Sequence, residues 1–247
     1  MSENPNRSLI GTGIIAFAVI ASTMLLGNAV VRARGGGEIK VTGSARKDID
    51  SDMIAWTGRI SYRSDTMGNG YSAVKTAIGK LTDYLKSKGL SEKEIVIGAV
   101  QTTALYEEKK EGGYDNGGYR SIKGYDVSQA VTVRSTKVNE VEQISRESTD
   151  LIAQGVPLVS ETPQFFYTKI GDVKREILGL AAEDARKRAE EVASKSGAGV
   201  GDVRGVRMAP LQITPRYDFE IYDSGFNDLT SKEKSISAVV TVTFGVK

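Results

Sequence analysis

The chain has 247 residues, of which 40% are hydrophobic and 26% are charged, a composition typical of a folded protein. Its 33 basic and 31 acidic side chains nearly cancel, so the net charge of +2 gives no electrostatic reason to expect a nucleic acid as a partner. The chain contains neither cysteine nor histidine, which excludes thiol nucleophiles, disulfides, Cys/His zinc sites and Ser-His-Asp triads.

The first distinctive feature along the chain is an uncharged apolar run from Leu9 to Val31, LIGTGIIAFAVIASTMLLGNAVV. As a helix, this run is long enough to cross the hydrocarbon core of a membrane. It therefore predicts one N-terminal hydrophobic helix that serves as an uncleaved anchor, followed by a glycine-rich tether that ends at residue 37. The alternative is a cleaved signal peptide, for which small-residue cleavage sites end at Ala29 and Ala33.

Residues 38–247 alternate between strand and helix patterns. Where hydrophobic and polar residues alternate, the pattern predicts two strands within 38–65 and further strands at 95–106, 125–135, 163–170, 203–213 and 235–246. Helical spacing of apolar residues predicts helices at 70–89, 137–154 and 172–196. This order favours an α+β fold of mostly antiparallel strands with three helices, in which 95–106 and 125–135 form a hairpin.

The third predicted helix carries small residues at regular intervals on one face. Its stripe has members four positions apart: Val173, Ile177, Ala181, Ala185, Ala189 and Ala193. Small side chains at these positions let a neighbouring element approach closely. The opposite face predicts three i,i+4 ion pairs, Glu183–Lys187, Asp184–Arg188 and Glu191–Lys195. The glycines that follow lie at the C-terminal end, so they end the helix rather than cradle a phosphate.

Three segments occur in the order seen in the SIMPL-domain family. LAAEDARKRAEEVASKSGAGVGDV (180–203) resembles the alanine-rich helix of that family, which leads through a glycine turn into a strand. IKVTGSARKDIDSDMIAWTGRIS (39–61) resembles its opening strand, with Asp52 at the aspartate position and Ser51 in place of the usual proline. GYDVSQAVTVRSTKVNEVEQISRESTDLIAQGV (124–156) resembles its central strand and helix. The resemblance covers about residues 38–247.

The resemblance implies a role in the bacterial cell envelope. SIMPL-domain proteins include periplasmic immunogenic proteins and proteins named for oxidative-stress defence; they form homo-oligomers and have no established catalytic activity. Residues 38–247 are therefore expected to form one extracytoplasmic, SIMPL-like domain that self-associates. The family supplies no catalytic, cofactor-binding or metal-binding residues to carry over. It favours an inner-membrane anchor with the domain in the periplasm, with secretion to the periplasm after signal cleavage as the alternative.

Two loops are the candidates for contact with another copy or a partner. The glycine-rich loop 107–120 holds Tyr114 and Tyr119, and the aromatic-acidic segment 215–234 holds Tyr217, Phe219, Tyr222 and Phe226. A long polar loop does not usually carry that many unburied rings, so those of the second segment favour packing against a neighbour or a subunit. The first loop is expected to be a mobile hairpin tip, with contact of its tyrosines with a partner as the alternative.

The second segment also carries four carboxylates, at Asp218, Glu220, Asp223 and Asp228. Carboxylates are calcium ligands, but the spacing of these four lacks the alternating ligands and central glycine of a calcium loop. No metal site, cofactor or small-molecule ligand is therefore predicted.

The sequence thus predicts a non-enzymatic, membrane-anchored envelope protein that self-associates and has a structural or stress-protective role. The alternative is an extracytoplasmic ligand-binding module or hydrolase that uses the glycine-rich and aromatic-acidic loops. A cluster of Asp, Glu and Tyr side chains in a deep pocket would favour the alternative, whereas loops that pack against other copies would favour the scaffold.

Overall fold

The structure is a computed structural model that describes residues 22–23, 37–107, 121–218 and 225–247. The chain separates into two compact units. Unit 1 comprises the described residues up to Ala45, together with Glu176–Pro210 and Ala238–Lys247; unit 2 comprises Arg46–Arg175 and Leu211–Ser237. The boundary expected at residue 37 stays a prediction.

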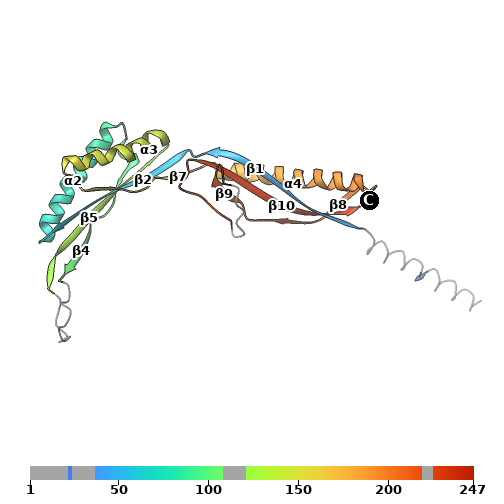
Figure 1. The fold of residues 1–247 in the computed structure, drawn as a ribbon, viewed down its shortest axis with the longest axis horizontal. Helices are drawn as coiled ribbons and strands as arrows, with labels where there is room; N and C mark the ends of the chain where they lie inside the picture. Colours follow the sequence, from blue (N-terminus) through green and yellow to red (C-terminus); the bar gives the residue numbers. More distant parts are fainter. Residues whose placement is uncertain (1–21, 24–36, 108–120, 219–224) are drawn as a thin grey trace, which may run out of the picture. The chain divides into compact units, whose positions relative to one another are not determined.

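The predicted α+β fold is confirmed, with three α-helices and mostly antiparallel strands among the described residues from 37 onwards (Figure 1). The strands are β1 (Glu38–Asp50), β2 (Met53–Ser64), β3 (Ile95–Ile97), β4 (Gln101–Tyr106), β5 (Ile122–Ser135), β6 (Leu158–Ser160), β7 (Gln164–Phe166), β8 (Val200–Met208), β9 (Gln212–Pro215) and β10 (Glu233–Val246). The α-helices are α2 (Met67–Ser87), α3 (Val138–Glu147) and α4 (Ile170–Lys195), and short 3-10 helices are η1 (Glu92–Glu94) and η2 (Ser148–Gln154).

The expected N-terminal helix lies outside the described residues, apart from Ser22 and Thr23, which are helical. Among the described helices, none is both long and apolar enough to cross a membrane.

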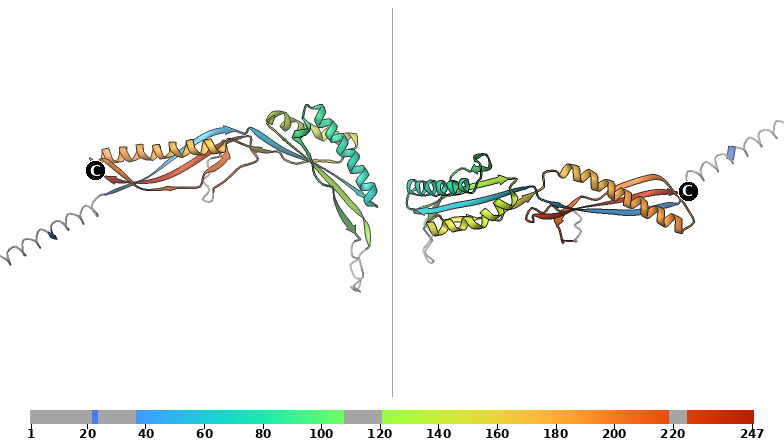
Figure 2. Two further views of the ribbon diagram at one scale, coloured as in Figure 1. Left: turned by 180° about the vertical axis from the view of Figure 1, so that it is seen from behind. Right: turned by 90° about the horizontal axis from the view of Figure 1, so that it is seen from above.

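Unit 2 is built on a sheet, here called sheet B, in which β5 and β2 are the central strands. The strand order is β3-β5-β2-β6, and β4 and β7 also pair with β5 and β2. Helices α2 and α3 cover one face of this sheet (Figure 2). The core between them contains Ile54, Trp56, Ile60, Val74, Ile78, Leu81, Leu85, Val127, Val131, Val133, Val141 and Ile144. The alternation of β2 thus places its even-numbered residues in the core and its odd-numbered residues on the uncovered face.

Most differences between prediction and structure in unit 2 concern short elements. The predicted hairpin forms, but its first strand is divided into β3 and β4, and the Gly98 amide between them donates to the Ala130 carbonyl (2.9 Å). The predicted helix 137–154 is α3 continued by η2, and it ends at Gly155, whose φ of 78° suits glycine. The short strands β6 and β9 were not separately predicted, because three or four residues are too few to show a period.

Unit 1 consists of α4 on one face of a sheet, here called sheet A, with the strand order β1-β10-β8 (Figure 2). The predicted stripe is confirmed as the buried face of α4, since Ala181, Ala185 and Ala189 are fully buried and Ala193 nearly so. Side chains of β10 that face the helix include Val240, Val242 and Phe244, and these are also buried.

The close approach predicted for the alanine stripe is made by the backbone of β1 at Gly43. A Cβ atom added to Gly43 would lie 2.2 Å from the Ala185 amide nitrogen and 2.3 Å from the Ala181 carbonyl oxygen. The next amide, that of Ser44, donates to the Asp184 carboxylate (2.8 Å). This bond, together with Arg188, lowers the pKa of Asp184. Only glycine therefore fits at residue 43.

Two of the three predicted ion pairs on the outer face of α4 are confirmed. Glu183 pairs with Lys187 (2.7 Å) and Asp184 pairs with Arg188 (2.9 Å). The third, Glu191–Lys195, is wrong for the described residues; Arg186–Glu190 (2.9 Å) forms on this face instead.

We expect Ala185→Leu to lower the free energy of unfolding by roughly 1 to 3 kcal/mol, because the backbone of β1 leaves no room for added methylenes. Glu183→Ala, on the exposed face of the same helix, is the matched control and should change it by less than about 0.5 kcal/mol. Urea unfolding of both variants measures the difference. Equal midpoints would show that the stripe does not face the sheet.

Candidate functional site

The structure describes only two of the six predicted contact residues. Tyr217 is 80% exposed and Phe226 is 40% exposed. The other four, Phe219, Tyr222, Tyr114 and Tyr119, lie outside the described residues. The candidate contact surface made by these six side chains therefore stays a prediction.

The start of the segment that carries Tyr217, which belongs to unit 2, is held in place by its neighbour Arg216. The guanidinium of Arg216 contacts three carboxylates, with the nearest nitrogen 2.6 Å from Asp50, 3.0 Å from Glu233 and 3.6 Å from Asp48. These carboxylates come from β1 and β10, so Arg216 holds the start of the segment against the two strands. These three carboxylates therefore have a structural role, and the guanidinium of Arg216 partly neutralises their charges.

The most deeply buried charges in the described chain are Lys234 and Asp228, which are 2% and 4% exposed. Their nearest charged atoms are 3.9 Å apart. The Lys234 ammonium donates to the carbonyl of Phe165 (2.8 Å) and to that of Asp228. The Asp228 carboxylate accepts the amide and hydroxyl of Thr230 (2.9 and 2.7 Å) and the amide of Ser231 (3.1 Å).

Burial and hydrogen bonding shift the pKa values of both members of the buried pair. Burial lowers the pKa of Lys234, and Asp228 opposes this effect. Burial acts to raise the pKa of Asp228, but the hydrogen bonds from Thr230 and Ser231 bring it below its ordinary value. The carboxylate of Asp228, which the sequence analysis weighed as a calcium ligand, is thus engaged in shaping its own loop. Among the described residues no group of three or more acidic side chains is placed to hold a metal ion.

The aspartate of the opening-strand motif also has a structural role. The Asp52 carboxylate accepts the amide and the hydroxyl of Thr168 (2.7 and 2.8 Å), which ties the β1–β2 turn to the end of β7. Ser51, which replaces the usual proline, donates its amide to the Lys232 carbonyl (3.0 Å). Proline could not make this bond because it lacks the amide hydrogen. The altered residue therefore adds a tie rather than disturbing the turn.

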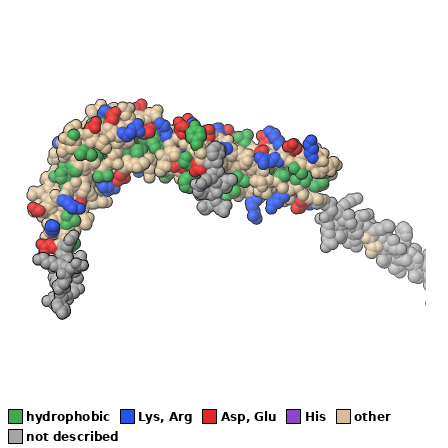
Figure 3. Space-filling model, in the orientation of Figure 1, with side chains coloured by type: hydrophobic (Ala, Val, Ile, Leu, Met, Phe, Trp, Pro, Cys, Tyr) green, Lys and Arg blue, Asp and Glu red, His purple; other side chains and the backbone are tan. Residues whose placement is uncertain are grey.

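A surface that the sequence analysis did not single out lies on β8, and we define the β8 surface as Val203, Val206 and Met208. These side chains are 53%, 59% and 61% exposed. Their partners on β10 are Phe244, Val242 and Val240, which are buried, so the β8 surface is the continuation of the core face beyond α4. Hydrophobic and basic side chains lie next to each other around β8 and α4 in Figure 3.

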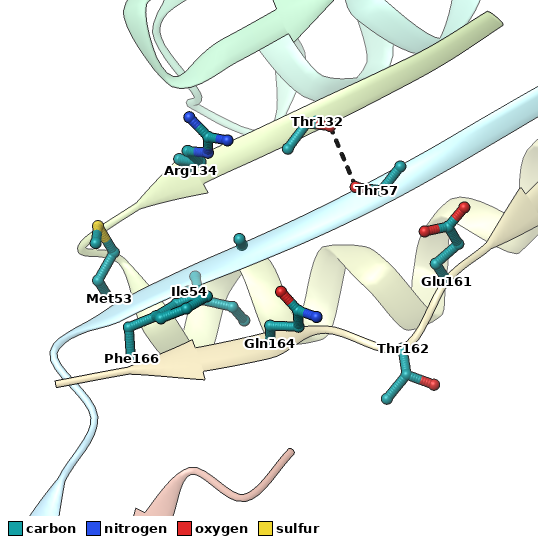
Figure 4. A pocket seen from close by; sticks show the side chains of 10 residues that line it. Met53, Ile54, Thr57, Thr132, Arg134, Glu161, Thr162, Gln164 and Phe166 are labelled. Carbon is teal, nitrogen blue, oxygen red and sulfur yellow. Dashed lines mark hydrogen bonds between the residues drawn. The ribbon is translucent and has the colours of Figure 1, made fainter. Parts of the chain in front are cut away.

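Besides the β8 surface, a hollow of about 560 Å³ lies on the uncovered face of sheet B (Figure 4). Its lining residues come from β2, β5, β7 and the turn before β7: Met53, Ile54, Ala55, Thr57, Thr132, Arg134, Glu161, Thr162, Gln164 and Phe166. Such a volume is within the range of small-molecule sites. We refer to it as the sheet B hollow.

The register of three strands explains why this hollow exists. Ala55 on β2 pairs with Arg134 on β5 and with Gln164 on β7, so the three residues form one row across the sheet. Paired residues point to the same face, and the short side chain of Ala55 leaves a gap between two long ones. The Thr57 and Thr132 hydroxyls are hydrogen-bonded to each other (3.2 Å) in the next row (Figure 4).

The described residues define an α+β protein in which the deeply buried charges hold the fold together and the uncovered sheet faces carry the accessible side chains. The sequence matches the SIMPL family, described as a protein of unknown function (DUF541), over residues 39–244. The chain therefore belongs to the SIMPL family, as the three motifs indicated.

The chain is similar to curated proteins of several bacteria. It is 26% identical to the 26 kDa periplasmic immunogenic proteins of Brucella melitensis biotype 1 and Brucella abortus (strain S19), over 85% of this chain and 84% of each relative. It is 24% identical to the uncharacterized protein YggE of Edwardsiella ictaluri, over 76% of this chain and 74% of that protein. The names of the Brucella proteins agree with the periplasmic location that was expected.

We expect Lys234→Ala to destabilise the protein by about 3 kcal/mol or more, because the Asp228 carboxylate stays buried without its partner charge. Lys232→Ala is the control two residues away. Lys232 pairs with Glu142 (3.0 Å) with its side chain 37% exposed, so its loss should cost no more than about 1 kcal/mol. Urea unfolding compares the two. Similar losses in both variants would contradict a special role for the buried pair.

Proposed function

We propose that this protein is a non-enzymatic cell-envelope protein that acts by self-association, with a structural or stress-protective role. The observation that carries the proposal is the β8 surface, an apolar strip on the strand at the end of sheet A. Membership of the SIMPL family and similarity to proteins named periplasmic support the location.

The position of β8 makes it suited to contact another copy. Among the described residues, β8 pairs with β10 along one edge and with no strand along the other. A free strand edge offers unpaired backbone amides and carbonyls to a second chain, and an exposed apolar face beside it adds a hydrophobic contribution. Arg204 and Arg207 on the same strand disfavour pairing with arbitrary partners, since each added strand must accommodate their charges.

The absence of catalysis is part of the proposal and is supported by chemistry. The chain has no histidine or cysteine, and the buried Lys234 and Asp228 are occupied by backbone and hydroxyl hydrogen bonds. A buried group with its hydrogen bonds satisfied within the fold is not free to exchange protons with a substrate.

We expect the chain from Glu38 onwards to be a homo-oligomer in solution, because the β8 surface is otherwise left in water. Multi-angle light scattering at tens of micromolar protein measures the mass. A mass equal to that of the monomer at that concentration would contradict the proposal.

Val206→Lys should reduce the oligomer to smaller species, since a desolvated ammonium in a hydrophobic contact is costly. Val159→Lys is the matched control, because Val159 on β6 is 60% exposed and lies in the other unit. It should leave the mass unchanged, and both variants should keep the far-UV circular dichroism spectrum of the parent, which shows that they remain folded. If the two variants dissociate equally or neither does, the contact is not at β8.

The N-terminal run is proposed to be an uncleaved inner-membrane anchor that leaves the rest of the chain in the periplasm. In that case the mature protein keeps Met1, or Ser2 after methionine removal, and stays with the membrane in high salt, which releases only electrostatically bound proteins. N-terminal sequencing from the native host measures this. A mature start at Val30 or Arg34, in the soluble envelope fraction, would instead show a secreted protein.

The alternative function is a ligand-binding module. The loops expected to form its site lie partly outside the described residues, but the sheet B hollow gives this alternative a different and specific basis.

A further inference from the structure

The sheet B hollow combines a positive charge with open hydrogen-bonding groups and an apolar wall. Its positive charge is the guanidinium of Arg134, which is exposed and has no carboxylate within salt-bridge distance among the described residues. The other two charges near the hollow neutralise each other, because Arg59 donates to the Glu161 carboxylate through two nitrogens (3.2 and 3.1 Å). The hollow therefore has an uncompensated charge of one sign.

The side chains around Arg134 give the hollow an apolar wall and a separate side with hydrogen-bonding groups. Met53 and Phe166 pair across β2 and β7 and are half-buried, so they form an apolar wall in the row next to Arg134. Gln164 and Thr162 make no side-chain hydrogen bond to other described residues. They are available as donors and acceptors on the side of the hollow opposite Arg134.

We propose that the sheet B hollow binds a small organic carboxylate with an apolar substituent. The carboxylate lies on the Arg134 guanidinium, whose planar donors match two carboxylate oxygens. The apolar substituent lies against Met53 and Phe166, and a polar group between the two reaches Gln164. This binding activity goes beyond the proposed self-association and does not depend on it.

The spacing of the strands fits a ligand of this size. Arg134 and Gln164 are on strands two positions apart, which places their backbones roughly 10 Å from each other, with only Ala55 between them. Successive same-face rows are roughly 7 Å apart, so a carboxylate on Arg134 and a ring on Phe166 are separated by about one amino-acid-sized molecule. An N-acylated aromatic amino acid has these groups in this arrangement.

The probe is N-acetyl-L-phenylalanine, and its carboxamide, which has the same shape without the charge, is the control ligand. The full chain is held in a non-ionic detergent, and saturation-transfer NMR titrations give the dissociation constant after subtraction of a protein-free micelle sample. We expect the acid to bind about tenfold or more tightly than the amide, because a charge-assisted pair is lost in the amide.

Arg134→Gln should weaken binding of the acid by about tenfold or more. Arg63→Gln is the matched control: Arg63 is an exposed arginine on β2, outside the hollow, and its replacement should leave the affinity unchanged. Equal affinities for acid and amide, or equal loss in the two variants, would overturn the proposal.

Ala55→Leu tests the cavity rather than the charge. The larger side chain fills the gap between Arg134 and Gln164 while both remain in place, so binding of the acid should be lost with an unchanged melting temperature. Full binding by this variant, or no saturation transfer in the parent protein at 10 mM probe (roughly the weakest affinity that such a small ligand would show), would contradict the assignment.

Discussion

The structure of unit 1 depends on the contact between the backbone of β1 at Gly43 and the backbone of α4 at Ala181 and Ala185. A helix and a strand can approach this closely only where neither carries a side chain larger than a methyl group. The Ser44–Asp184 hydrogen bond then sets the position of the helix along the strand. On the same sheet, the β8 surface stays exposed although its partners on β10 are buried.

Much of this fold could be predicted from period and spacing. The alanines at every fourth position indicated a close-approach face, and the alternation within 38–65 indicated the strands that are β1 and β2. The partner of the stripe could not be predicted, because Gly43 is one of 27 glycines and nothing local marks it as the contact. Likewise, the division of the hairpin at Gly98 and the short strands β6 and β9 depend on tertiary pairing rather than on local pattern.

The candidate sites were harder to predict for a related reason. Lys234 lies at the start of β10 in a run of charged residues, where an exposed side chain is the normal expectation. Its burial depends on Phe165, which is distant in the sequence, and on Asp228, which lies outside the named helices and strands. The sheet B hollow depends on the register that places Arg134, Ala55 and Gln164 in one row. No single segment of the sequence contains that row. The one local signal was Ala55, a small side chain on the face of β2 opposite the core.

The most direct test of the central contact is amide hydrogen exchange of Gly43→Ala. The added methyl group would overlap the helix backbone, so we expect amides of α4 between Glu176 and Lys195 to exchange about tenfold faster or more, while those of α2 keep their protection. Exchange of α4 at the parental rate in this variant would show that β1 and α4 do not meet at this residue.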